Sequence, residues 1–264
     1  MNIHSGADVT VNGRSYRFPR TPTVVVCIDG SEPGYIERAI EAGVAPNFAR
    51  LMRGGASLTA LSAMPSFTNP NNISIITGRP PAVHGIAGNY FYDPATGTEV
   101  MMNDAKFLRA PTIMQAFHDA GAKVAVVTAK DKLRTLLGNG LDMSSGRAIA
   151  FSSEKADKAT VQEHGIGDVL ARVGMKLPEV YSADLSELVM AAGVSILKRE
   201  RPDLMYLSTT DYVQHKAAPG GAVANSFYAM MDRHVGALDA AGCVLVLTAD
   251  HGMNDKHRAN GEPD

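Results

Sequence analysis

Three apolar runs in this chain end in side chains that bind metal ions. The runs and their polar ends are VVVCIDG with Asp29, LMYLSTTDYVQH with Asp211 and His215, and VLVLTADHGM with Asp250 and His251. Each run is rich in Val, Leu, Ile or Met, which is typical of a strand buried in a parallel sheet. The carboxyl ends of such strands meet at one edge of an open α/β sheet, where ligands bind. We therefore expect these side chains to lie together and to form a divalent metal centre, with two metals the better fit.

Apolar runs alternate with helical patterns from residue 111 onward. The strands are expected at residues 123–129, 203–209 and 243–249, and the helices at residues 111–121, 130–137, 183–198 and 222–240. Strands separated by helices are joined in parallel through right-handed crossovers. This order predicts an α/β protein, a three-layer α/β/α sandwich with a mostly parallel central sheet.

The residue patterns in the first part of the chain predict hairpins, helices and further strands. The hairpins are expected at residues 9–18 and 89–102, the strands at 22–28 and 57–64, and the helices at 35–42, 46–52 and 71–77. The first hairpin contains Asn12-Gly13 between alternating residues, which is a strong signal for a type I′ turn.

A single domain over residues 1–264 fits this order of elements. Residues 144–180 are rich in Ser, Gly and Lys with weak periodicity, so we expect an insertion or linker there. After the last predicted strand the chain continues only in polar, turn-like residues. Because this would leave a sheet face uncovered, we expect the domain to be incomplete at its C-terminal end.

Composition excludes two classes of partner. The 264 residues carry a net charge of −2 and scattered Lys and Arg residues, so we expect no nucleic acid as a partner. No apolar run approaches the roughly 18 residues of a membrane helix, and the first residues do not resemble a secretory signal. Cys27 and Cys243 are expected to be buried free thiols in a reducing compartment. We therefore expect a cytoplasmic protein with a small-molecule substrate and no membrane partner, and a homodimer is left open.

Each of the three polar motifs has a simpler explanation when it is taken alone. Asp250 can serve as an N-cap beside an unrelated His251, and Asp29 can belong to a plain turn. The i, i+4 spacing of Asp211 and His215 places both on one face of a helical turn, which is also common in solvated turns. Three such motifs at the ends of predicted core strands favour the metal centre. Carboxylate oxygens with imidazole nitrogens suit zinc first, and manganese or iron next.

A threonine near a predicted helix start adds a candidate nucleophile. Thr68 stands in PSFTNPNN, at or next to the N-cap of the helix at residues 71–77. Free backbone N–H groups and the positive end of the helix dipole favour an anion such as phosphate there. A nearby dication can ionise the hydroxyl group. We expect Thr68 to be a nucleophile, although an ordinary N-cap is the simpler explanation without the metal ligands.

Further polar side chains are candidates for binding a substrate. Asn89 follows a Gly-rich loop and can donate its amide to a phosphoryl oxygen. Lys130 and Lys132 follow a predicted strand, so they can hold a second anionic group at the same edge, unless they belong to a solvated helix start. His84 and His257 lie in loops and are not assigned as ligands.

Together these residues resemble the alkaline phosphatase superfamily over nearly the whole chain. The motifs that carry the resemblance are CIDG, PSFTNPNN, PPAVHGIAGNYF, TTDYVQH and TADHGM. The resemblance implies an alkaline-phosphatase-like catalytic domain with two Zn²⁺ ions at the carboxyl edge of the sheet. It places Asp29, Thr68, Asp250 and His251 around one ion, and Asp211 and His215 around the other. It also implies one more histidine for the second ion, from a segment well downstream.

Within the superfamily, the chain is most similar to enzymes that hydrolyse the carbon–phosphorus bond of phosphonoacetate, near the nucleotide pyrophosphatase/phosphodiesterase branch. This similarity implies acetate and phosphate as products and a phosphothreonine intermediate. A phosphodiesterase or nucleotide pyrophosphatase shares every metal ligand and the threonine. A metal-dependent phosphoglycerate mutase also belongs to the superfamily, although serine is typical of that branch at the nucleophile position. A metal-binding fragment without activity is the candidate from a different class.

Overall fold

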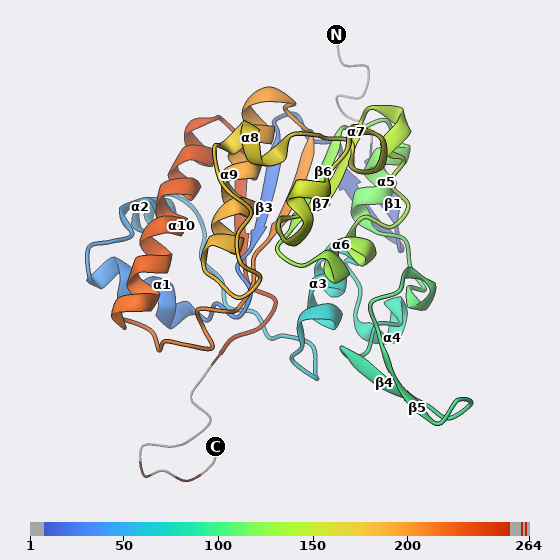
Figure 1. Cartoon of the computed structure of the whole chain (residues 1–264), viewed down its shortest axis with the longest axis horizontal. Coiled ribbons are helices and arrows are strands. Elements are labelled where there is room, and N and C mark those ends of the chain that lie inside the picture. The colour runs from blue at the N-terminus through green and yellow to red at the C-terminus, as the bar shows by residue number, and fades with distance from the viewer. Residues whose placement is uncertain (1–7, 254–259, 261, 263–264) are drawn as a thin grey trace.

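Parallel strands form the centre of the protein in the computed structural model, which describes residues 8–253, 260 and 262. The sheet has the order β7-β6-β8-β3-β9, with β3 at Thr23–Cys27, β6 at Val124–Thr128, β7 at Ala148–Ser152, β8 at Leu204–Ser208 and β9 at Val244–Thr248. Each strand pairs with its neighbours in parallel. The carboxyl ends of all the strands therefore lie at one edge of the sheet (Figure 1).

Helices cover both faces of this sheet (Figure 1). One face carries α1 (Pro33–Glu41), α2 (Pro46–Gly54), α9 (Asp184–Arg199) and α10 (Ala222–Ala240), and the opposite face carries α3 (Thr68–Thr77), α5 (Ile113–Asp119) and α6 (Asp131–Leu137). Successive strand residues point to opposite faces. Val124 and Val126 of β6 accordingly join one hydrophobic core, while Ala125 and Val127 join the other. The predicted α/β/α sandwich is confirmed.

Two antiparallel hairpins stand outside the central sheet, as the sequence predicted. They are β1 (Asp8–Val11) with β2 (Arg14–Arg17), and β4 (Tyr90–Asp93) with β5 (Thr98–Met101). Asn12 and Gly13 have φ angles of 53° and 69°, as a type I′ turn requires. The β4–β5 hairpin projects beyond the short helix α4 (Pro81–His84), at the edge of the molecule (Figure 1).

Residues 57–64 do not form the predicted strand. Among the described residues, no strand pairs with this segment, and Leu58 and Leu61 are 92% and 98% exposed. These two leucines stand three residues apart, which departs from the period of two that a half-buried strand requires. The apolar composition of the segment was therefore a misleading signal.

Strand β7 was not expected from the sequence, and it lies within residues 144–180. It is short, and its AIAFS sequence is rich in Ala and Ser, which are not strong strand formers. All of its residues are buried, and it pairs with β6, so residues 148–152 belong to the domain core. Short helices lie before and after β7 in the chain, namely η2 (Met143–Ser145), η3 (Ser153–Lys158), α7 (Val161–His164) and α8 (Val169–Val173), while η1 (Ala105–Phe107) lies between β5 and α5. An insertion stays a prediction for the residues that follow β7.

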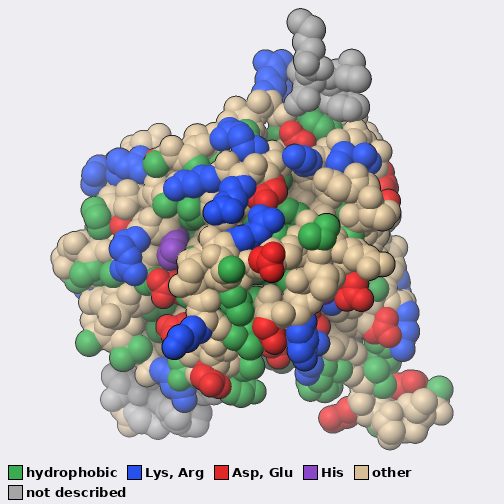
Figure 2. Space-filling view, turned by 45° about the horizontal axis from the view of Figure 1, so that its top comes forward, with side chains coloured by type: hydrophobic (Ala, Val, Ile, Leu, Met, Phe, Trp, Pro, Cys, Tyr) green, Lys and Arg blue, Asp and Glu red, His purple; other side chains and the backbone are tan. Residues whose placement is uncertain are grey.

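The surface carries charges of both signs. On the face drawn in Figure 2, Lys and Arg side chains are most frequent in the upper half, and Asp and Glu side chains are most frequent in the lower half. The absence of a nucleic-acid partner stays a prediction from the net charge of −2. No described helix has the length and apolar character needed to cross a membrane.

Candidate metal centre and active site

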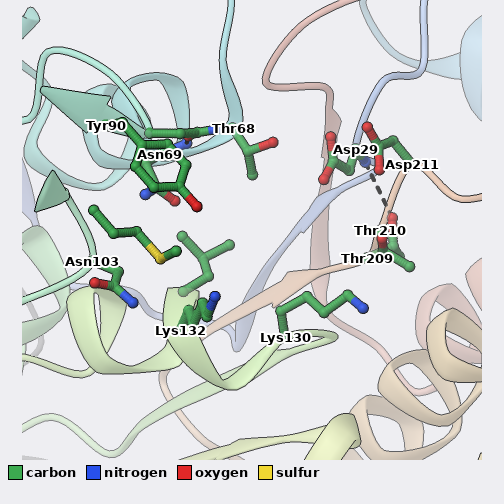
Figure 3. A pocket seen from close by; sticks show the side chains of 13 residues that line it. Asp29, Thr68, Asn69, Tyr90, Asn103, Lys130, Lys132, Thr209, Thr210 and Asp211 are labelled. Carbon is green, nitrogen blue, oxygen red and sulfur yellow. Dashed lines mark hydrogen bonds between the residues drawn. The ribbon is translucent and has the colours of Figure 1, made fainter. Parts of the chain in front are cut away.

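The polar strand ends lie next to one another at the carboxyl edge of the sheet. Asp29 follows β3, Asp211 follows β8 and Asp250 follows β9. Because β8, β3 and β9 are neighbours in the sheet, the strand order brings these residues together. Figure 3 shows Asp29 and Asp211 side by side at one cavity.

Asp29, Asp250 and His251 form a compact group at this edge. Their ligand atoms all lie within 4.8 Å of one another. The Nε2 atom of His251 is 3.3 Å from Oδ1 of Asp29 and 3.9 Å from Oδ2 of Asp250. The two aspartates are buried, at 4% and 3% exposed. One imidazole and two carboxylates at this spacing suit a zinc ion.

The electrostatics of this group favour a bound cation. Burial raises the pKa of Asp29 well above its usual value, and the charges of Asp250 and Asp211 raise it further. Burial also raises the pKa of Asp250. The buried Oδ1 atom of Asp29 accepts no hydrogen bond from the described residues. A dication between the carboxylates would offset their repulsion and satisfy this oxygen, so the residues present fit a metal.

Asp211 and His215 form a second pair beside the first group. Oδ2 of Asp211 lies 3.0 Å from Nε2 of His215, and the backbone N–H of His215 donates to the carbonyl of Asp211 at 3.0 Å. The side chain of Asp211 is 24% exposed and that of His215 is 53% exposed, so this pair is more open to solvent than the first group. Gly30 has a φ of 70°, and a Cβ there would lie 3.0 Å from Cβ of Asp211. A glycine at this position therefore lets the end of β3 approach the Asp211 turn closely.

Thr68 is the first residue of α3, one position inside the N-cap residue Phe67. Its side chain lines the same cavity as Asp29 and Asp211, and its hydroxyl group points toward them (Figure 3). The positive end of the helix dipole lies at this residue and favours an anion bound beside it. Thr68 is therefore placed where a nucleophile for phosphorus chemistry is needed.

Asn89 lines the cavity with one side of its amide already engaged. Its Oδ1 atom accepts a hydrogen bond of 3.1 Å from the backbone N–H of Asn69, next to Thr68. The amide of Asn69 in turn donates to the carbonyl of Met102 at 3.0 Å, which ties the start of α3 to the end of the β4–β5 hairpin. Because Oδ1 faces α3, the NH₂ group of Asn89 is left to donate to an anion.

Lys130 and Lys132 stand at the start of α6, on the other side of the cavity from Thr68 (Figure 3). The Nζ atom of Lys130 donates to the carbonyl of Val180 at 3.1 Å and lies 4.6 Å from the ring centroid of Tyr181. Burial lowers the pKa of Lys130, and the charge of Lys132 acts in the same direction. The two ammonium groups are placed to bind an anionic group that lies away from the metal ligands.

The cavity between these groups has a volume of about 270 Å³. Several of its lining residues were not expected from the sequence, namely Asn69, Tyr90, Met101, Asn103, Leu133, Thr209 and Thr210. Thr209 and Thr210 directly precede Asp211, so their place at a strand end was a usable signal. Tyr90 and Met101 pair at the base of the β4–β5 hairpin, and this base lies at the cavity, which no local pattern indicates.

His84 lies outside the metal centre and is fully buried. Its Nε2 atom is 3.0 Å from Oγ of Ser74, and its Nδ1 atom accepts from the backbone N–H of Ile86 at 3.2 Å. Burial lowers the pKa of His84 to about 4, so the ring is neutral near pH 7. His257, the other unassigned imidazole, lies outside the described residues.

The chain belongs to the family of type I phosphodiesterases and nucleotide pyrophosphatases. The family model matches residues 23–261, which is nearly the whole chain. The parallel sheet with acidic residues at neighbouring strand ends is the part of the fold that this match contains. The resemblance to the alkaline phosphatase superfamily is confirmed.

Among solved structures, the chain is similar to phosphonoacetate hydrolase from Sinorhizobium meliloti 1021, determined in complex with phosphonoformate and with phosphonoacetate. The two are 63% identical with a TM-score of 0.95, over 98% of this chain and 63% of that chain. Murine ectonucleotide pyrophosphatase/phosphodiesterase 5 shares the fold, with a TM-score of 0.60 and 19% identity over 91% of this chain and 59% of that chain.

A curated relative belongs to the same family but is much longer. Ectonucleotide pyrophosphatase/phosphodiesterase family member 1 of Mus musculus is 26% identical over 254 residues, which are 89% of this chain and 24% of that protein. The chain thus spans 63% of the Sinorhizobium structure and about a quarter of the mouse protein.

Proposed function

We propose that this chain hydrolyses the carbon–phosphorus bond of phosphonoacetate to acetate and phosphate. The observation that carries the proposal is the separation of charge in the cavity, with carboxylates and Thr68 on one side and Lys130 and Lys132 on the other. Such a site suits a small molecule with two anionic ends, one beside the metal ligands and one beside the lysines. The Sinorhizobium protein, at 63% identity, binds phosphonoacetate, which has a phosphonate and a carboxylate.

Two Zn²⁺ ions are the proposed cofactors, and Mn²⁺ or Fe²⁺ could take their place. The proposed ligands are Asp29, Thr68, Asp250 and His251 for one ion, and Asp211 and His215, with a further histidine that the family resemblance implies, for the other. When bound, the ions supply Lewis acidity to the phosphonate oxygens and lower the pKa of the threonine hydroxyl group.

Thr68 is the proposed nucleophile. The NH₂ group of Asn89 donates to a phosphonate oxygen and holds phosphorus next to Thr68. The Oγ atom of Thr68 loses its proton to solvent and attacks phosphorus in line with the carbon atom. A phosphorus–oxygen bond forms as the phosphorus–carbon bond breaks, which leaves phosphothreonine at residue 68.

The lysines make the carbon a feasible leaving group. The electron pair of the broken bond stays on carbon, and the adjacent carboxylate delocalises it as an enediolate. Lys130 and Lys132 stabilise this charge electrostatically, and the carbon then takes a proton from solvent to give acetate. Water attacks the phosphorus of phosphothreonine, releases phosphate and restores the hydroxyl group of Thr68.

A phosphodiesterase or nucleotide pyrophosphatase activity is the second candidate, because the family model carries that description. The two lysines on the side of the cavity away from Thr68 favour phosphonoacetate, because a diester has no carboxylate to place there. A metal-binding fragment without activity is the third candidate.

The proposal also includes a cytoplasmic location and no nucleic-acid or membrane partner. Cys27 and Cys243 are both free thiols, which suits a reducing compartment. A homodimer is left open, and its presence would not alter the chemistry described.

A direct assay separates these candidates. The purified chain, loaded with zinc, is given phosphonoacetate and, separately, an aryl phosphodiester. We expect acetate and phosphate in equal amounts from the first and slower turnover of the second. Thr68→Ala should abolish both activities with zinc content largely kept, whereas Thr68→Ser should retain measurable turnover. Faster turnover of the diester would support the second candidate, and no turnover of either substrate would support the third.

A further inference from the structure

Asn72 is a buried asparagine that uses its whole amide in hydrogen bonds. It lies one helical turn after Thr68 in α3 and is fully buried. Its Nδ2 atom donates to the carbonyl of Thr68 at 3.1 Å and to Oδ2 of Asp250 at 2.9 Å. Its Oδ1 atom accepts from the hydroxyl groups of Tyr206 at 2.9 Å and Ser208 at 3.3 Å. Two donors and two acceptor positions are thus all occupied.

The orientation of this amide follows from its partners. The Thr68 carbonyl and the Asp250 carboxylate, in its ionised form, can only accept hydrogen bonds, so they require the NH₂ side of Asn72. Burial raises the pKa of Tyr206 well above its usual value, so its hydroxyl group keeps the proton that it donates to Asn72. If the Asn72 amide were flipped, its Oδ1 atom, an acceptor, would face the Thr68 carbonyl and the Asp250 carboxylate, which are also acceptors.

Asn72 also limits how Asp250 can bind a cation. Oδ1 of Asp250 already accepts from the backbone N–H groups of Gly30 at 3.3 Å and His251 at 3.0 Å. Oδ2 accepts from Asn72 and is the oxygen that lies 3.9 Å from Nε2 of His251. These hydrogen bonds hold both oxygens of the Asp250 carboxylate and so fix its orientation at the metal centre.

The same amide joins parts of the site that are far apart in the sequence. Thr68 belongs to α3, Asp250 follows β9, and Tyr206 and Ser208 belong to β8, the strand that leads to Asp211. The side chain of Asn72 therefore holds three parts of the site in fixed positions relative to one another, namely the helical turn that begins at Thr68, the Asp250 carboxylate and strand β8.

We propose that Asn72 is a positioning residue of the metal centre, which orients the Asp250 carboxylate toward the cation and holds the Thr68 turn against it. This inference rests on the proposed function in that Asp250 is taken as a metal ligand. It predicts that Asn72 acts on metal affinity and on the chemical step, while substrate binding by Asn89 and the lysines is largely unaffected.

The test compares two neighbouring asparagines of α3. Asn72→Ser removes the contact with Asp250, and Asn72→Asp keeps the shape but replaces both donors with acceptors. Asn71→Ala is the matched control, because Asn71 is also buried but its amide binds the loop groups Ala63 and Phe67. Zinc affinity is measured without substrate by competition with a chelating dye, and folding by circular dichroism.

We expect the Asn72 variants to bind zinc about 10- to 100-fold more weakly, the range usual for partners that orient metal ligands. Their kcat for phosphonoacetate should fall more than their KM changes. Asn71→Ala should keep the zinc affinity of the wild type. Tyr206→Phe, which leaves both donors of Asn72 in place, should have a smaller effect than Asn72→Ser.

Zinc affinity equal to that of the wild type in a folded Asn72→Ser or Asn72→Asp protein would overturn the inference. So would an equal loss in Asn71→Ala, since the effect would then be a general loss of helix packing. If Asn72→Asp does not fold, Tyr206→Phe and Asn72→Ser decide the question. A wild-type chain that binds zinc but leaves phosphonoacetate intact would refute the proposed function alone, because the affinity comparison needs no substrate.

Discussion

The Nε2 atom of His251 lies 3.3 Å from Oδ1 of Asp29, although the two residues come from opposite ends of the described chain. They follow β9 and β3, which are neighbours in the central sheet. The same Oδ1 atom is buried and accepts no hydrogen bond from the described residues. Two buried carboxylates and an imidazole therefore meet in an arrangement that is unfavourable without a cation and favourable with one.

Replacing Asp29 should have opposite effects on the metal-free and metal-loaded proteins. Asp29→Asn keeps the shape of the side chain, removes a buried charge and supplies an NH₂ group that can donate to Asp250. In a chelator, the free energy of unfolding should rise by about 1–3 kcal/mol, the usual cost of an unsatisfied buried group. Added zinc should stabilise the wild type by ~2.7 kcal/mol at a hundred times its Kd, and the variant by much less.

Denaturant unfolding with and without zinc checks this prediction. Asp239→Asn is the control, because Asp239 is partly exposed and pairs with Arg50 at 2.7 Å on the surface. It should change stability by no more than about 0.5 kcal/mol in either condition. A less stable metal-free Asp29→Asn protein would show that the carboxylate is satisfied without a cation.

The Asp211–His215 pair should be needed for one of the two ions and not for the other. Asp211→Ala or His215→Ala removes one side of a contact of 3.0 Å and leaves the Asp29 group intact. Zinc per chain, measured by elemental analysis after dialysis, should fall by about half. His234→Ala is the control, since His234 lies 3.6 Å from Glu187 and is not one of the proposed zinc ligands. Full zinc occupancy in both site variants would remove the pair from the ligand set.

The two lysines should matter for a substrate that carries a carboxylate. Replacing both Lys130 and Lys132 with Ala should lower kcat/KM for phosphonoacetate at least about tenfold more than kcat/KM for an aryl phosphodiester. The reason is that only phosphonoacetate places a second anionic group, and later an enediolate, on their side of the cavity. An equal loss on both substrates would mean that the lysines support the fold or the phosphonate instead.

Tyr181 should affect the hydrolysis of phosphonoacetate through its contact with Lys130. Its ring lies 4.6 Å from Nζ of Lys130 and its side chain is 78% exposed, so its removal should leave the fold intact. Tyr181→Leu should lower kcat/KM for phosphonoacetate roughly 2- to 5-fold, which corresponds to the ~0.5–1 kcal/mol of an exposed cation–π contact. Tyr181→Phe keeps the ring face and should restore most of the activity. Equal activity of the Leu and Phe variants would exclude a role for the ring.

His84 should make the protein less stable in mild acid. Its pKa is lowered by burial to about 4, whereas the unfolded value is about 6.5. Between these values the unfolded state binds more protons than the folded state, so stability falls as the pH falls from about 6.5 to about 4. His84→Gln removes this titration, and its unfolding free energy should depend less steeply on pH in that window. Parallel pH profiles for variant and wild type would contradict the assignment.

Much of the fold could be predicted because its signals are local. Strands β3, β6, β8 and β9 are apolar runs of the right length, and Asn12-Gly13 specifies a hairpin turn by its own backbone preferences. Strand β7 escaped prediction because AIAFS is short and low in strong strand formers, so its state depends on pairing with β6. At residues 57–64 a strand was predicted and does not form. An apolar segment needs a neighbouring strand to pair with, and this segment has none among the described strands.

The sequence by itself determined the α/β class and the residue types at the strand ends, because periodicity and residue chemistry are written in consecutive positions. Only the tertiary structure decided that β8, β3 and β9 are neighbours, and hence that Asp211, Asp29 and Asp250 meet. It also decided that the amide of Asn72, the last residue of PSFTNPNN, binds Asp250 at 2.9 Å. The physical reason is that hydrogen bonds and electrostatic repulsion act over a few ångströms of space, whatever the separation of the residues along the chain.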